Sequence, residues 1–294
     1  MELSTEQLWL LKQNAISAAY QAGTYISKQV NRKLNVGTKA SGDSLASQVF
    51  TEVDMESQNI VSQVLEPTLE AFDLGFLAEE SPDNGSRLQK DYFWCIDPLD
   101  GTLPFINQQH GYSVSIALVR KDGVPVVGVV YDPLKQNLYH AYFDGGAFFN
   151  HNKIVIPENN DEVLHLYSDR SFAEQKFFPD VVKKFEEQHQ STGCKRVELH
   201  TTAGGAMNAC MVLQHANACY FKFPKDEEGG GSFWDYAASA CIFNEAGAIS
   251  CDMFGVPLEL NRPESTYMNH KGILYASKKR ITEVVLETFN SFPI

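Results

Sequence analysis

The spacing of apolar residues predicts two helices at the start of the chain. Apolar side chains recur every three or four positions over residues 5–30, as on the buried face of an amphipathic helix. A polar loop over residues 37–44 follows. The second helix should begin at Thr51, because Thr51 and Asp54 have the spacing of a capping box, and Pro67 is expected to mark its end.

Short apolar runs separated by turn residues then predict a largely antiparallel sheet. The pair Asp122-Gly123 lies between two of these runs and is a strong signal for a β-hairpin. The expected extended segments cover residues 72–81, 93–96, 112–120, 124–131, 138–143 and 147–149. The first half of the chain should therefore consist of helices packed on this sheet.

Beyond a polar stretch at residues 157–162, strand and helix patterns alternate. The expected strands are 163–167, 196–199, 218–223, 249–251 and 273–276, and the expected helices are 174–190, 203–215, 234–246 and 278–289. Gly247 stands where a left-handed C-terminal cap belongs. The alternation predicts an α/β layer. The polar stretch is taken as the boundary between an N-terminal α+β domain, residues 1–157, and a C-terminal α/β domain, residues 158–294.

Composition narrows the choice of partners. The chain has 294 residues and a net charge of −13, so no excess of lysine and arginine is present to neutralise a nucleic acid polymer. The six cysteines show no C-x-x-C spacing and are expected to be buried as small side chains. No apolar run approaches the roughly 20 residues that cross a bilayer. The first residues lack the pattern of a signal peptide. We therefore expect a cytoplasmic protein with no membrane partner.

The candidate chemistry centres on the stretch WCIDPLDGTLPF at residues 94–105, where an apolar run ends in a turn-forming sequence. Asp97 and Asp100 lie three residues apart and could share one hard divalent cation such as Mg²⁺, or bridge two. Directly afterwards, the backbone N–H groups of Gly101 and Thr102 would begin a short helix, which is a place to bind phosphate. The purely structural alternative is that this stretch is a surface turn, because aspartate, proline and glycine are common turn residues.

Three further acids could join this site, and each also has a purely structural explanation. Asp54 could act only as the capping-box residue of its helix. Glu79, next to Glu80 at the end of an apolar run, could belong to a solvated acidic turn. Asp235, at the start of an alanine-rich helix, would stabilise that helix as a first-turn acid in any case. Spacing alone leaves these alternatives open.

Taken together, the motifs resemble those of the inositol monophosphatase superfamily, which contains Mg²⁺-dependent, lithium-sensitive phosphomonoesterases. The resemblance rests on Asp54, FLAEES at residues 76–81, DPLDGT at 97–102 and WD at 234–235, and it covers nearly the whole chain. It implies a layered α/β/α/β/α fold of the inositol monophosphatase and fructose-1,6-bisphosphatase type. It also implies a phosphoric monoester hydrolase that acts on a small phosphorylated metabolite. Many members are homodimers, so a homodimer is one expectation here.

The resemblance also implies a set of metal ligands. Glu79, Asp97 and the carbonyl oxygen of Leu99 would hold a first Mg²⁺ ion. Asp97, Asp100 and Asp235 would hold a second, so that Asp97 bridges the two. Glu79 would help with a third, looser ion. The expected cofactor is therefore two or three Mg²⁺ ions.

By the same resemblance, Thr102 and Asp54 form the catalytic pair. They would orient a metal-activated water for attack on phosphorus. The backbone N–H groups of Gly101 and Thr102 would receive the phosphate.

Departures from the family pattern bear on the substrate. Lys222 stands at about the place where inositol monophosphatases carry an acid that contacts the inositol hydroxyls. A lysine suits a second phosphate better, although an exposed strand lysine is the structural alternative. The runs at residues 168–171, 255–261 and 267–274 resemble 3′(2′),5′-bisphosphate nucleotidases more closely.

The leading hypothesis is therefore a 3′(2′),5′-bisphosphate nucleotidase. The first alternative is an inositol monophosphatase, and a further alternative is a non-catalytic protein that binds phosphorylated metabolites on the same fold. An acidic, glycine-rich segment at residues 226–232 has no counterpart in the resemblance, and one interpretation is a lid or gate beside the pocket.

Overall fold

The computed structural model describes residues 2–32, 36–38, 49–158, 162–188 and 192–292. The helices are α1 (Thr5–Gln29), α3 (Glu52–Ala71), α4 (Thr102–Ile106), α5 (Arg170–Ala173), α6 (Phe178–Gln188), α7 (Gly205–Val212), α8 (Phe233–Ala246) and α9 (Lys279–Asn290), with a 3₁₀ turn at Ser86–Leu88. None of the helices in these ranges combines the length and the apolar character needed to span a bilayer.

The first sheet has the strand order β3-β4-β5-β6-β7-β8-β9. Its strands are β3 (Gly75–Ala78), β4 (Tyr92–Asp100), β5 (Ser113–Arg120), β6 (Pro125–Asp132), β7 (Asn137–Tyr142), β8 (Gly146–Phe149) and β9 (Asn152–Lys153). Only the β3–β4 pair in this sheet is parallel. The predicted antiparallel meander is therefore confirmed.

The second sheet has the order β11-β10-β12-β14-β13. Its strands are β10 (Val163–Tyr167), β11 (Arg196–His200), β12 (Ala218–Lys222), β13 (Ile249–Cys251) and β14 (Ile273–Ala276). The pairs β10–β11 and β10–β12 are parallel, and the other two pairs are antiparallel. A small ladder joins β1 (Val36–Thr38) to β2 (Val49–Thr51).

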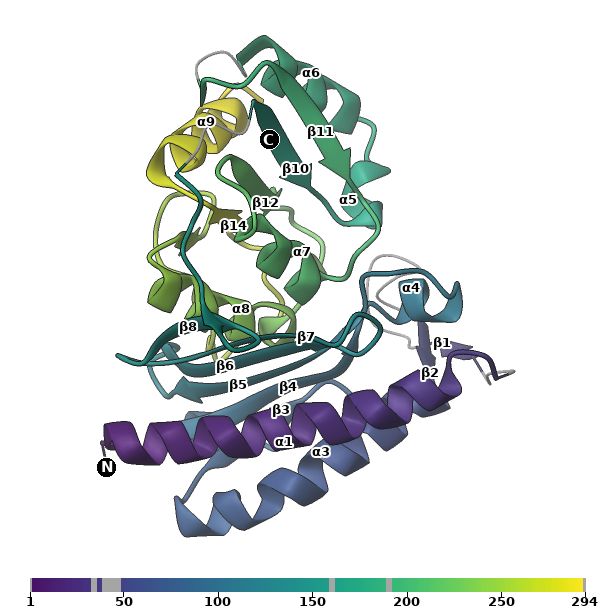
Figure 1. Ribbon diagram of the computed structural model, residues 1–294, viewed down its shortest axis with the longest axis vertical. Coiled ribbons are helices and arrows are strands. Elements are labelled where there is room, and N and C mark those ends of the chain that lie inside the picture. The colour runs from purple at the N-terminus through teal and green to yellow at the C-terminus, as the bar shows by residue number, and fades with distance from the viewer. Residues whose placement is uncertain (1, 33–35, 39–48, 159–161, 189–191, 293–294) are drawn as a thin grey trace.

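The elements stack in five layers (Figure 1). Helices α1 and α3 cover the outer face of the first sheet, α7 and α8 lie between the sheets, and α6 and α9 cover the outer face of the second. This is the α/β/α/β/α arrangement that the sequence predicted. The domain boundary at residue 157 stays a prediction.

Helix α8 explains how the two sheets come close enough to share a site. It is alanine-rich, and its side chains are buried nearly all round, because it is sandwiched between two apolar faces. A Cβ atom on Gly128 of β6 would lie 2.2 Å from the carbonyl oxygen of Ala238, so only glycine allows this approach. The hydroxyl of Ser115 on β5 also donates a hydrogen bond, 3.0 Å long, to the carbonyl oxygen of Trp234.

Two boundaries differ from the prediction. Helix α3 continues through Pro67 to Ala71. Proline removes one helical donor, but Leu65 and Thr68 on either side of it are buried, and Thr68 accepts a hydrogen bond of 2.9 Å from the indole of Trp94. This packing outweighs the missing bond.

The helix expected over residues 174–190 begins only at Phe178, as α6, and the short helix α5 ends just before the expected range. Pro179 lies in the first turn of α6, where a missing N–H costs nothing. Residues 189–190, like residues 39–44 of the expected polar loop, lie outside the described ranges.

Candidate active site

Strand β4 does not end before the aspartates but carries them. Its register against β5 pairs Asp97 with Ser115 and Asp100 with Ser113, so β4 has one extra residue between these pairs, which is a β-bulge. In a regular strand, residues three apart point to opposite faces of the sheet. The bulge removes this alternation and lets both carboxylates serve one site. The carbonyl oxygen of Pro98 within the bulge accepts a hydrogen bond of 2.7 Å from Ser57 of α3.

Asp100 is held by the start of α7. One carboxylate oxygen accepts a hydrogen bond from the backbone N–H of Gly205, and the other from that of Ala206, both at 2.9 Å. A Cβ atom on Gly204 would lie 2.4 Å from the Asp100 carboxylate, so the contact requires glycine there. The sequence analysis missed this partner, although the small-residue run TTAGGA at residues 201–206 could have signalled a close backbone approach.

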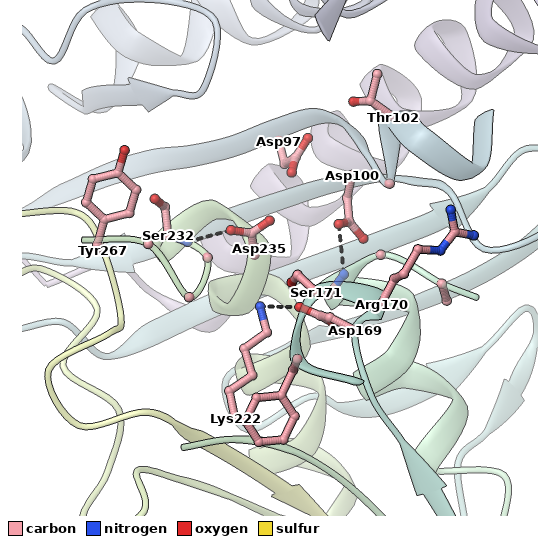
Figure 2. A pocket seen from close by; sticks show the side chains of 18 of the residues that line it. Asp97, Asp100, Thr102, Asp169, Arg170, Ser171, Lys222, Ser232, Asp235 and Tyr267 are labelled. Atoms are coloured by element: carbon pink, nitrogen blue, oxygen red, sulfur yellow. Dashed lines mark hydrogen bonds and ion pairs between the residues drawn. The ribbon is translucent and has the colours of Figure 1, made fainter. Parts of the chain in front are cut away.

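Asp235 completes a cluster of three carboxylates. It occupies the third position of α8, where it forms a capping box with Ser232. One oxygen from each of Asp97, Asp100 and Asp235 lies within 4.8 Å of the others. Figure 2 shows the three side chains converging from β4 and α8. The structural explanation of Asp235 is therefore correct, and it does not exclude a place in the site.

The electrostatics of this cluster fit a divalent cation. Burial raises the pKa of Asp97 well above its usual range, and repulsion from Glu79 and Asp100 adds to this. The pKa of Asp100 is also raised well above its usual range, first by burial and next by the Asp235 carboxylate. The pKa of Asp235 is raised to about 7, first by burial and next by Glu79. Oxygen ligands that repel each other in a buried site are what a hard cation such as Mg²⁺ would stabilise in the ionised form.

Glu79 and Leu99 lie at the wall of the same pocket. Glu79 follows β3, and its backbone N–H donates a hydrogen bond of 3.1 Å to the carbonyl oxygen of Ile96 on β4. The parallel pairing of β3 with β4 thus carries Glu79 to the aspartates. Leu99, whose side chain is buried, lies in the bulge between them.

Asp54 and Thr102 are joined, although they are far apart in the sequence. The hydroxyl of Thr102 donates a hydrogen bond of 2.8 Å to one carboxylate oxygen of Asp54. The other oxygen accepts from the backbone N–H of Thr51 at 2.7 Å and from its hydroxyl at 2.6 Å. Asp54 is therefore the capping-box residue of α3 and also contacts Thr102, and its catalytic role stays a prediction. Burial raises the pKa of Asp54, and the hydrogen bonds from Thr51 and Thr102 oppose this shift.

The carboxylates lie at one side of a cavity of about 660 Å³. Gly101 also lines it and adopts a left-handed backbone with φ of 84° at the start of α4, as glycine readily does. Its other wall comes from the second half of the chain, through the segments that follow β10 and β12 and the segment that precedes α8.

Lys222 belongs to that other wall and is buried, so its interpretation as an exposed strand lysine is wrong. Its ammonium group forms an ion pair with Asp169 (Figure 2) and lies over the ring of Tyr236. Burial alone would lower the pKa of Lys222, but Asp169 and Tyr236 together outweigh burial and the pKa is raised.

Asp169 was not among the predicted site residues. One of its carboxylate oxygens accepts hydrogen bonds from the hydroxyl of Tyr220 at 2.7 Å and from the side-chain amide of Asn208 at 3.0 Å. The only signal was its position in the run at residues 168–171. Nothing in that run shows that Asp169 faces Lys222.

The acidic, glycine-rich segment also reaches the cavity, through Glu227 and residues 229–232. The carbonyl oxygen of Gly230 accepts a hydrogen bond of 2.7 Å from the hydroxyl of Tyr236, and that of Gly231 accepts one of 2.9 Å from the backbone of Met268. The end of the segment next to α8 is thus attached to the body of the protein. A lid or gate role stays a prediction.

Comparison with known proteins shows the family of this chain. The model of the inositol monophosphatase family matches residues 10–292. The chain is 24% identical to inositol-1-monophosphatase of Bacillus subtilis, over 92% of each chain. It is 29% identical to the 3′(2′),5′-bisphosphate nucleotidase CysQ of Aggregatibacter actinomycetemcomitans, over 87% of this chain and 89% of the relative.

Among solved structures, one described as an IMPase/NADP phosphatase complexed with NADP and Ca²⁺ shares the fold. Its TM-score is 0.74 at 19% identity, and the match covers 99% of this chain and 98% of the other. The layered fold and the family match over nearly the whole chain lead to one conclusion: this chain belongs to the inositol monophosphatase family of phosphatases.

Proposed function

We propose that this chain is a Mg²⁺-dependent phosphatase that hydrolyses a phosphomonoester of a 3′(2′),5′-bisphosphate nucleotide. The observation that carries the reaction type is the convergence of three carboxylates, those of Asp97 and Asp100 buried and that of Asp235 partly exposed, beside the Asp54–Thr102 pair at one side of a large cavity. The observation that favours a nucleotide is the composition of the opposite wall.

The proposed metal ligands are Glu79, Asp97, Asp100, Asp235 and the carbonyl oxygen of Leu99, for two or three ions. The raised pKa values of the three clustered aspartates are the physical support, because carboxylates that are desolvated and repel one another are stabilised in their ionised form by a bound cation. When bound there, Mg²⁺ would neutralise the phosphoryl oxygens and lower the pKa of water.

The chain's own groups would position and deprotonate the attacking water. The hydroxyl of Thr102 can accept a hydrogen bond from that water while it donates to Asp54. Asp54 is then the proton acceptor, and its raised pKa brings its basicity closer to what proton transfer near neutral pH requires. The backbone N–H groups of Gly101 and Thr102 are proposed to receive the phosphate oxygens.

The opposite wall suits a nucleotide with a second phosphate. Lys222, Arg170 and Lys225 all line the cavity there. An ammonium group has three donors, so Lys222 can hold Asp169 and still donate to a phosphate oxygen. Phe177 also lines this wall, is 37% exposed and stacks on Phe223. An aromatic face at a pocket wall can bind a base by stacking.

Inositol monophosphate remains the alternative substrate. Asp169 and Glu227 place carboxylates in the cavity, and carboxylates accept hydrogen bonds from ring hydroxyls. Although Lys222 replaces the expected acid in the sequence, Asp169 brings an acid next to it from the segment between β10 and α5.

Phosphate release from four compounds tests these possibilities, each with Mg²⁺ and with EDTA. The compounds are 3′-phosphoadenosine 5′-phosphate, inositol 1-phosphate, fructose 1,6-bisphosphate and AMP. The proposal expects Mg²⁺-dependent release with clear preference for the first. Preference for inositol 1-phosphate would retain the reaction and replace the substrate. No release from any compound would contradict the proposed reaction and favour the non-catalytic alternative.

A further inference from the structure

Within the described residues, a second cluster of potential metal ligands lies outside the active-site pocket. It consists of His165 on β10 with Glu198 and His200 on β11, and one ligand atom from each lies within 4.8 Å of the others. The parallel register places His165 opposite Glu198 and Tyr167 opposite His200. Because side chains alternate between the faces of a sheet, all four share one face.

The two imidazoles already have a separation that suits a shared ion. Nδ1 of His165 lies 3.0 Å from Nε2 of His200, and a carboxylate oxygen of Glu198 lies 3.8 Å from that same Nε2. Two nitrogens bound to one Zn²⁺ at about 2.1 Å each are about 3.0 Å apart at a right angle and about 3.4 Å apart at the tetrahedral angle. Coordination by the two imidazoles therefore requires a shift of a few tenths of an ångström at most.

Aromatic neighbours hold both rings in this orientation. The ring of His165 stacks on His215, with centroids 3.8 Å apart, and the ring of His200 stacks on Tyr167, with centroids 4.6 Å apart. The hydroxyl of Tyr167 lies 3.0 Å from Nε2 of His215 and so links the two stacks. Ligands whose rotamers are held by their neighbours lose less entropy when an ion binds.

The cluster is also open to solvent on one side. His165 is buried, whereas the side chains of His200 and Glu198 are 29% and 41% exposed, which provides an entry path. Burial, and next the neighbouring His165, lower the pKa of His200, while Glu198 opposes this. A neutral imidazole at neutral pH is the form that binds metals.

We propose that His165, His200 and Glu198 form a binding site for one Zn²⁺ ion or a similar first-row transition-metal ion, with Tyr167 and His215 as positioning residues. Two imidazoles and one carboxylate suit zinc, cobalt or nickel, whereas Mg²⁺ prefers oxygen ligands alone. The site therefore differs in metal preference from the carboxylate cluster. Because β11 is the edge strand of the second sheet, the ion would join that edge to β10.

The test is the affinity for Zn²⁺ in the presence of excess Mg²⁺. Competition with a chromophoric chelator measures this affinity. The wild type and Asp235→Asn should each bind one Zn²⁺ tightly, because Asp235 belongs to the other cluster. His200→Ala should bind that ion at least about tenfold more weakly. His151→Ala, which removes an exposed histidine between β8 and β9, is the matched control and should bind as the wild type does.

A second variant keeps the proposal testable if His200→Ala does not fold. Glu198→Gln keeps the size of a partly exposed side chain, and it should lose much of the increase in melting temperature that Zn²⁺ produces in the wild type. The proposal is overturned if His200→Ala and Glu198→Gln both respond to zinc as the wild type does, or if Asp235→Asn abolishes the binding. The two histidines would then be a hydrogen-bonded pair only.

Discussion

The two walls of the active-site cavity handle charge in opposite ways. On the first-sheet side, the carboxylates of Asp97 and Asp100 face that of Asp235. On the second-sheet side, the acid Asp169 faces the cation Lys222. The first wall thus brings several negative charges close together, whereas the second wall pairs a negative charge with a positive one.

This difference separates two tasks. Carboxylates that are buried together raise each other's pKa and favour a bound cation, which is why we propose the metal ions at the first wall. A paired acid and base need no such ion and hold a fixed geometry, so the second wall is suited to selecting a substrate. The first wall is also rigid, because Asp54, Asp100 and Asp235 each accept hydrogen bonds from backbone N–H groups near the start of a helix.

The largest expected effect comes from removing one charge from the first wall. Asp100→Asn should reduce kcat/KM by about a thousandfold or more, because metal ions supply several kcal/mol of transition-state stabilisation. Asp132→Asn is the matched control, since Asp132 is equally buried and accepts hydrogen bonds from two backbone N–H groups, those of Leu134 and Lys135. Steady-state phosphate release measures both. Equal losses in the two variants would contradict a specific metal role.

A smaller loss is expected when only the hydroxyl proposed to be catalytic, that of Thr102, is removed. Thr102→Val keeps the shape of the side chain but breaks the hydrogen bond to Asp54, and kcat should fall by about 10²–10³. Thr68→Val is the control. It removes a buried hydroxyl of α3 that accepts a hydrogen bond from Trp94 and does not line the cavity. It should lower the melting temperature with little change in kcat. A normal kcat in Thr102→Val would exclude Thr102 from the reaction.

Changing the second wall should alter substrate preference more than turnover. Lys222→Met removes the ammonium and leaves Asp169 without its cation. We expect kcat/KM for 3′-phosphoadenosine 5′-phosphate to fall by about 10–100-fold, as for the loss of one charge-assisted contact. The value for inositol 1-phosphate should change much less. A parallel loss for both substrates would mean that Lys222 only supports the wall.

The smallest expected effect is a change of stability with pH in EDTA. In the metal-free protein the pKa of Asp235 is about 7, above the usual value of 3.8, so the folded state binds more protons than the unfolded state between these values. Stability should therefore fall as the pH rises from about 4 to 7.

Melting temperatures at pH 5.5 and 7.5 check this. The value in EDTA should be roughly 2–6 °C lower at pH 7.5, and Mg²⁺ should reduce the difference. Asp235→Asn is the control and should show a smaller pH dependence than the wild type. An equal pH dependence in the variant would assign the effect to other groups.

Much of the first wall could be predicted from the sequence because its parts are local. The capping boxes at Thr51 and Ser232 span three residues each, and the aspartates of β4 are equally close to each other. Such spacing determines helix starts and turns through contacts within one turn of the chain. Short-range patterns likewise predicted the antiparallel sheet and the alternating second half, whereas the five-layer arrangement was implied by the resemblance to the inositol monophosphatase superfamily.

The second wall depended on tertiary structure. Asp169 follows β10 and Lys222 ends β12, so the pairing of these two strands brings the side chains together. In the first wall, the contact of Asp100 with the start of α7, more than a hundred residues later, also depends on tertiary structure. Neither contact leaves a trace in local spacing, because each is set by which strands pair and in which register. The β4 bulge and the continuation of α3 through Pro67 were likewise decided by packing against distant residues. Local sequence specified the chemical groups, and the pairing of the two sheets specified which of them meet.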